Sequence, residues 1–159
     1  MYDQILTRIT TADEKDKLTE EINLLLQSLY ENKGFGFDSV LRNKIRAWVS
    51  AYFQEEFAKE GLDKENYLKN LKEKINNLRE VDLVLAYEPS SEMLNTLSGY
   101  LREATQENVV LNLNFDPHLI GGVQIIFDGQ FRDYSFKRIF EKEFEESRNR
   151  ILELLQSKK

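Results

Sequence analysis

Apolar residues in the first half of the chain recur every three or four positions, which is the spacing of helices with one buried face. The first such segment carries a stripe made of Leu18, Ile22, Leu25 and Leu29. Thr11 and Glu14 have the spacing of a capping box, so this helix is predicted to begin there. Gly34 and Gly36 are predicted to end it.

Two further helices are predicted in this half. Asp38 or Ser39 can cap the second, whose apolar positions extend over residues 41–57. Asp63 can cap the third, which has one apolar face and many Lys, Glu and Asn residues elsewhere. The sequence therefore predicts an N-terminal helical domain over residues 1–80.

The pattern changes after residue 80. "VDLVLAY" and the alternating "VVLNLNF" are typical of strands, and the segment between them has helical spacing. This order predicts a βαβ unit with parallel strands and a right-handed crossover. Asp128-Gly129 then predicts a hairpin with a type I′ turn, and a long helix follows to the C-terminus. The fold class is thus α+β, with a small α/β domain over residues 81–159.

Composition narrows the range of functions. The chain has 159 residues, no Cys and a net charge of −6, so an acidic surface argues against nucleic acid as a partner. No apolar run approaches the roughly 20 residues of a membrane-spanning helix, and the N-terminus lacks the pattern of a signal peptide. A cytoplasmic protein without membrane insertion is expected.

The polar residues between 114 and 136 give little support to catalysis. His118 is the only histidine, and with no Cys beside it, zinc ligation and a catalytic triad are not favoured. Gly121 and Gly122 lead into a strand, whereas phosphate-binding glycines lead into a helix. Asp116 and Asp133 fit turn and capping roles. No catalytic, cofactor-binding or metal-binding residue is predicted.

The same stretch, taken in order, carries a family resemblance. "VVLNLNF", "DPHLIGG", "VQIIF" and "DYS" resemble the C-terminal domain of the ATP synthase delta subunit, called OSCP in mitochondria. The preceding "VDLVLAYEPSSEMLNTLSGYL" is similar to the strand, turn and helix that come before this motif in the family. The residues that carry the motif are Asp116, Pro117, Leu119, Ile120, Gly121, Gly122, Asp133 and Ser135. The family's front domain is normally longer than the 80 residues found here.

The resemblance implies a non-catalytic stator in the peripheral stalk of a proton-transporting ATP synthase. Such a subunit joins the F1 catalytic head, through its alpha and beta subunits, to the helix of a b-type subunit, so that the head does not turn with the rotor during ATP synthesis. It would lie at the inner face of the cell membrane as part of a hetero-oligomeric complex. Partner helices need exposed apolar helix faces, and the candidate positions are Leu18, Ile22, Leu25, Leu29, Phe140, Phe144, Ile151 and Leu155.

Other functions stay open on the sequence alone. The E subunit of archaeal and vacuolar rotary ATPases and the stator of the flagellar export ATPase have a similar general design, although both usually have a long uninterrupted helical front. A different class is a small α/β ligand-binding domain or an enzyme that uses Asp116, His118 and Asp133. That function would need a pocket with shifted pKa values around these residues.

Overall fold

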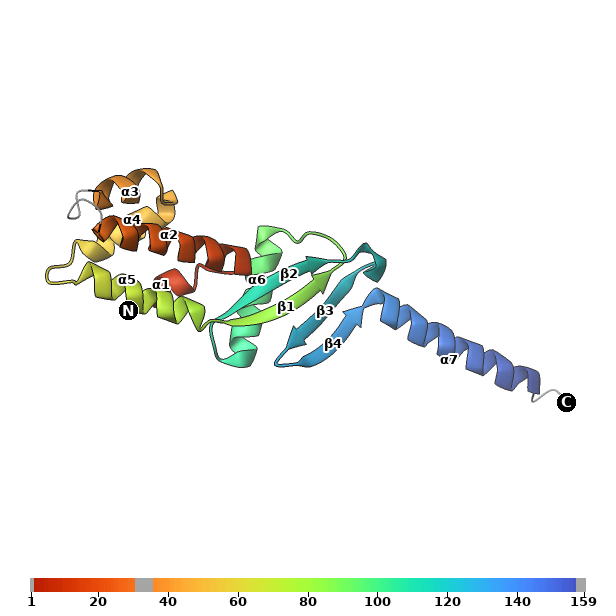
Figure 1. The fold of residues 1–159 in the computed structure, drawn as a ribbon. Helices are drawn as coiled ribbons and strands as arrows, with labels where there is room; N and C mark the ends of the chain where they lie inside the picture. The colour runs from red at the N-terminus through yellow and green to blue at the C-terminus, as the bar shows by residue number, and fades with distance from the viewer. Residues whose placement is uncertain (1, 31–35, 157–159) are drawn as a thin grey trace. The chain divides into compact units, whose positions relative to one another are not determined.

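The computed structural model describes residues 2–30 and 36–156, with residues 151–156 described as helix backbone only. The predicted helix break at Gly34 lies outside these residues. Two compact units are present (Figure 1): Met1–Arg79 with Ser98–Val110, here called the helical unit, and Glu80–Leu97 with Leu111–Lys159, here called the sheet unit. The helical unit thus combines the helices predicted over residues 1–80 with a later segment of the chain.

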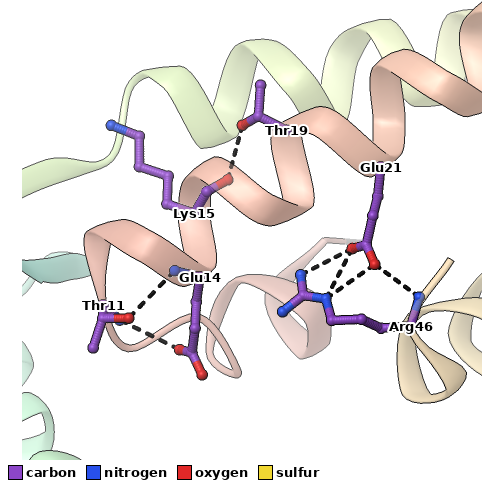
Figure 2. A network of polar contacts seen from close by, with 6 residues as sticks. All are labelled: Thr11, Glu14, Lys15, Thr19, Glu21 and Arg46. Carbon is purple, nitrogen blue, oxygen red and sulfur yellow. Dashed lines mark hydrogen bonds and ion pairs between the residues drawn. The ribbon is translucent and has the colours of Figure 1, made fainter.

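Local capping signals begin two helices of the helical unit as predicted. Its helices are α1 (Asp3–Leu6), α2 (Ala12–Tyr30), α3 (Phe37–Asn43), α4 (Ala47–Phe57) and α5 (Lys64–Asn76). At the start of α2, the N–H of Glu14 donates to Thr11 Oγ1 and the N–H of Thr11 donates to Glu14 Oε2, both at 3.3 Å (Figure 2). At the start of α5, Asp63 accepts from the N–H groups of residues 65 and 66. Both capping predictions are confirmed.

The helix predicted over residues 41–57 is in fact two helices, α3 and α4. Neither Asp38 nor Ser39 caps it, because α3 already begins at Phe37. Arg46 has an extended conformation, with φ −53° and ψ 140°, and is the N-cap of α4. Its N–H donates to Oε1 of Glu21 in α2, at 2.8 Å. The backbone N–H at the break is therefore hydrogen-bonded to a side chain that lies 25 residues earlier in the sequence.

The stripe of α2 lies in the core of the helical unit, which corrects its predicted role as a surface for a partner helix. Leu18, Ile22 and Leu25 are each 0% exposed, and Leu29 packs against the same core. Their neighbours in this core include Phe53 of α4 and the apolar face of α5. Burial of Leu18, Ile22 and Leu25 stabilises the unit itself, so these three are not available to another protein, and Leu29 is partly buried.

The sheet unit has the predicted α+β elements. The elements after α5 are β1 (Arg79–Leu85), α6 (Ser91–Thr105), β2 (Val109–Phe115), the 3₁₀ turn η2 (Pro117–Leu119), β3 (Gly122–Phe127), β4 (Gln130–Ser135) and α7 (Phe136–Gln156). The second half of α6 and the first two residues of β2 belong to the helical unit, and all but the first residue of β1 and the remaining elements belong to the sheet unit. The strand order is β2-β1-β3-β4 in a mixed sheet, in which β3 is antiparallel to both of its neighbours. The α+β fold class, with a long C-terminal helix, is confirmed.

The β3–β4 hairpin has the predicted turn. Asp128 and Gly129 both have positive φ, 51° and 71°, as a type I′ turn requires. The pairing then continues without a bulge from Phe127 opposite Gln130 to Gly122 opposite Ser135. This register fixes where β4 ends, and therefore where α7 begins.

A candidate partner-binding surface

The loop after β2 is ordered by its own aspartate. Asp116 Oδ1 accepts from the N–H and from Nδ1 of His118, both at 2.9 Å, and these bonds hold the pKa of the carboxyl below its usual range. Leu119 is buried, whereas Ile120, at φ 65°, is 68% exposed. The loop is an Asx-type turn that anchors one apolar side chain and presents another.

The two glycines after this turn lie in close packing with the residues around the start of α7. A Cβ on Gly121 would lie 2.7 Å from the ring of Phe136, and a Cβ on Gly122 would lie 2.3 Å from the carbonyl oxygen of Tyr134. Gly122 also has φ 81°, which favours glycine. The N–H of Phe136 donates to the carbonyl of Gly121 at 3.0 Å. The glycine pair therefore lets the loop contact the first residue of α7.

Asp133 and Ser135 hold the start of α7 from the other side. The N–H of Ser135 donates to Asp133 Oδ1 at 2.8 Å, and the N–H of Arg138 donates to Ser135 Oγ at 3.3 Å. Ser135 is thus an N-cap, and Asp133 orients it. The hydroxyl and the N–H of Ser135, together with the amide of Gln124, hold the pKa of Asp133 below its usual range.

We expect Asp133→Ala to lower the free energy of unfolding at pH 7 by roughly 1 kcal/mol, the usual size of a lost side-chain hydrogen bond to the backbone. Because the pKa of Asp133 is lowered in the folded state, its contribution is present above the unfolded pKa of about 3.9 and is lost as the pH falls through the folded value. Urea unfolding at several pH values between neutral and acid should therefore show a weaker acid destabilisation in the variant. Asp16→Ala, at an exposed position of α2, is the control and should change the free energy of unfolding at pH 7 by about 0.5 kcal/mol or less.

The helix held by this motif has an apolar face open to solvent. All described side chains of α7, residues 136–150, are exposed. The four apolar ones are Phe136 (50% exposed), Ile139 (51%), Phe140 (49%) and Phe144 (73%). Phe136, Phe140 and Phe144 follow one another at four-residue steps, so they share one face of the helix. The predicted candidates Phe140 and Phe144 thus lie at the surface, while the side chains of Ile151 and Leu155 lie outside the described residues.

The sheet unit also has an apolar hollow that the sequence did not indicate. It has a volume of about 110 Å³, and its lining residues are Leu85, Ala86, Tyr87, Met93, Leu97, Gly122 and Val123. Tyr87 is 63% exposed at its edge. The residues come from β1, the following turn, α6 and β3, and only the tertiary fold brings them together. The one local signal was the tyrosine that precedes Glu-Pro in "AYEP".

Of the three residues proposed for an alternative enzymatic function, two contact each other and the third has different partners. His118 contacts Asp116 at an exposed turn, and Asp133 contacts Ser135 and Gln124. The bond of Asp116 stabilises a turn, the bond of Asp133 to Ser135 stabilises a helix start, and the bond of Asp133 to Gln124 joins β4 to β3. Across the described ranges, no group of three or more His, Asp or Glu side chains is placed to hold a metal ion.

These features define a small α+β protein in which a glycine and capping motif fixes the start of an exposed, partly apolar helix. The sequence model of the ATP synthase delta (OSCP) subunit family matches residues 63–151, more than half of the chain, and the chain belongs to this family. The family is that of a non-catalytic subunit of ATP synthase.

The match confirms the resemblance noted in the motif residues and also includes α5, upstream of it. Residues 1–62, which form α1 to α4, lie outside the matched range. None of the curated protein sequences compared with the chain matches it. Among the helices of the described residues, none has the length and apolar character needed to cross a membrane.

Proposed function

We propose that the protein is the peripheral-stalk stator of an F-type ATP synthase, which links the F1 head to the helix of a b-type subunit. Membership of the delta (OSCP) family supports the complex, and the observation that supports the linking role is the exposed phenylalanine face of α7. In this proposal Phe140 and Phe144 contact an amphipathic stalk helix. Two apolar helix faces that meet in this way remove surface from water on both partners.

The attachment of α7 to the sheet suits the mechanical load that a stator must resist. Its first residue is tethered through Gly121, and its capping residues come from β4, so that a load on the helix is carried by hydrogen bonds and by the β3–β4 pairing. Contacts of the helical unit with the F1 alpha subunits are part of the same proposal. The interface there excludes the buried stripe of α2.

Co-purification tests this function. Tagged wild-type protein, recovered from its native host at the inner face of the membrane, should bring down F1 alpha and beta subunits together with a b-type subunit. The double variant Phe140→Ser, Phe144→Ser should lose the b-type subunit, because it removes the apolar face without touching the core. Lys142→Ser with Glu146→Ser is the matched control, since this exposed pair, at 3.8 Å, lies on another face of the same helix.

Three results would contradict the proposal. Recovery of a different rotary ATPase would favour an E-subunit-like or flagellar-export-type stator. Recovery of the protein alone, with melting that depends on a small ligand, would favour a ligand-binding domain. Equal recovery of the b-type subunit with both double variants would place the stalk contact elsewhere on the chain.

A further inference from the structure

The face of α7 that bears the phenylalanines also has an arrangement of charge that fits one particular occupant. Phe140, Phe144, Ser147 and position 151 follow the alternating four- and three-residue steps of a coiled-coil seam. We call these four positions the seam. Glu143 and Arg150 border it on one flank, each one residue before a seam position. Glu141 and Arg148 border it on the other, each one residue after a seam position.

We propose that the free protein pairs with a second copy of itself through α7, with the two helices antiparallel. In an antiparallel pair, each flank of one helix meets the same flank of the other. Glu143 then lies beside Arg150 of the second copy, and Glu141 lies beside Arg148 of the second copy. The two-fold symmetry repeats both contacts. All four flanking charges meet an opposite charge.

In this register, the side chains that meet at the centre of the seam also complement each other in size. When the flanking charges are paired, Phe144 lies opposite Ser147 of the second copy. A large side chain therefore faces a small one across the centre of the pair, as tight packing requires. A parallel pair instead sets serine against serine and phenylalanine against phenylalanine. It also leaves Glu141 and Arg150 without an opposite charge, so the antiparallel arrangement is the better fit.

Two observations on the single chain support a partner for this face. Within the described residues, none of Glu141, Glu143, Arg148 and Arg150 forms an ion pair, whereas Lys142 and Glu146 on the outer side are paired with each other. The described side chains of α7 are also all exposed, so beyond its tethered first turn the helix has little stabilisation from tertiary burial. Pairing would give these side chains counter-charges and would bury the phenylalanines.

The pair is expected to be weak, because a contact made by one helix from each copy is small by the standard of permanent dimers. A stalk helix and a second copy would use the same face and exclude each other. Self-pairing would therefore cover the phenylalanines only until the subunit is assembled. It does not depend on the identity of the stalk helix, so the co-purification result and the self-pairing result are independent of each other.

Sedimentation equilibrium of the full chain at about 1 to 100 µM, a range suited to weak pairs, tests the proposal. The average mass should rise from 18.8 kDa towards that of a dimer as the concentration increases. Glu143→Arg should weaken pairing roughly tenfold, because it sets two arginines side by side at symmetric sites. Glu145→Arg makes the same change of charge on the outer face and should leave pairing unchanged.

A charge exchange tests the orientation. Glu143→Arg combined with Arg150→Glu should restore pairing if the helices are antiparallel, whereas rescue by Glu143→Arg with Arg148→Glu alone would indicate a parallel pair and overturn the proposal. A mass of one chain at all concentrations would also overturn it, as would pairing of the Glu143→Arg variant at wild-type strength. These exposed positions do not contribute to the core, so circular dichroism should show that each variant is folded.

Discussion

Replacing Gly122 by Ala is expected to lower the free energy of unfolding of the sheet unit by about 3 kcal/mol or more, since backbone strain and overpacking add. The added Cβ would lie 2.3 Å from the carbonyl oxygen of Tyr134 and 2.9 Å from Cα of Ser135. These atoms belong to the backbone of the paired strand β4, so no side-chain rotation can relieve the overlap. The φ of 81° at Gly122 adds strain of its own.

The expected damage extends to α7. Gly122 lies opposite Ser135 in the hairpin register, and Ser135 caps α7. A shift of β4 that relieves the contact would therefore move the cap and the first turn of the exposed helix. We expect Gly122→Ala to reduce recovery of the b-type subunit as well as stability, although the residue lies outside the phenylalanine face.

Substitutions at two other glycines distinguish backbone strain from overlap with β4 as the cause of the loss. Gly129 has a similar φ of 71° but no atom within 4 Å of an added Cβ, so Gly129→Ala should cost only about 1–2 kcal/mol of conformational strain. Gly99, inside α6, has the same open space and no positive φ, so Gly99→Ala should stabilise by roughly 0.5–1 kcal/mol. Urea unfolding followed by far-ultraviolet circular dichroism should give this order. Equal losses in Gly122→Ala and Gly129→Ala would show that the approach to β4 is unimportant.

The elements that could be predicted from the sequence are those whose cause is local. The capping box of Thr11 and Glu14, the cap at Asp63 and the Asp128-Gly129 turn each depend on residues within a few positions of one another. Each appears in the structure where the sequence predicted it. The motif from Asp116 to Ser135 was likewise recognisable, because its turn, glycines and cap are read in chain order.

The break between α3 and α4 could not be predicted, since it has no local signal. Neither a glycine nor a proline lies between Asn43 and Ala47, and the group that holds Arg46 is Glu21 of α2. Long-range hydrogen bonds of this kind override the helical spacing of the apolar residues. From the sequence pattern alone, one continuous helix was predicted across the break.

The sequence pattern also could not show which of the two apolar helix faces is buried. The leucines and isoleucine of α2 and the phenylalanines of α7 have the same three- or four-residue spacing, yet the first set is 0% exposed at Leu18 and the second is 73% exposed at Phe144. Helical periodicity shows that a face is apolar but not what covers it. Only the packing of α2 within the helical unit distinguished a core stripe from a candidate interface.

Replacing Glu21 by Ala is expected to lower the free energy of unfolding of the helical unit by about 3 kcal/mol, the cost of breaking a largely buried ion pair. The Glu21 side chain is 10% exposed and that of Arg46 is 29% exposed. The carboxylate accepts from the backbone N–H of Arg46 at 2.8 Å, from Nε at 3.0 and 3.1 Å, and from Nη2 at 2.9 Å (Figure 2). Alanine would leave the N–H and the guanidinium without these acceptors.

The single tryptophan provides a probe for this unit. The guanidinium of Arg46 lies 5.3 Å from the ring centre of Trp48, so Trp48 fluorescence during urea unfolding should report the loss directly. Glu146→Ala removes an exposed ion pair in α7 and should change the free energy of unfolding by about 0.5 kcal/mol or less. Because Arg46→Ala removes the charge that Glu21 neutralises, the double variant should cost less than the sum of the single variants. Strictly additive losses would contradict the pairing of Glu21 with Arg46, and with it the explanation of the break before α4.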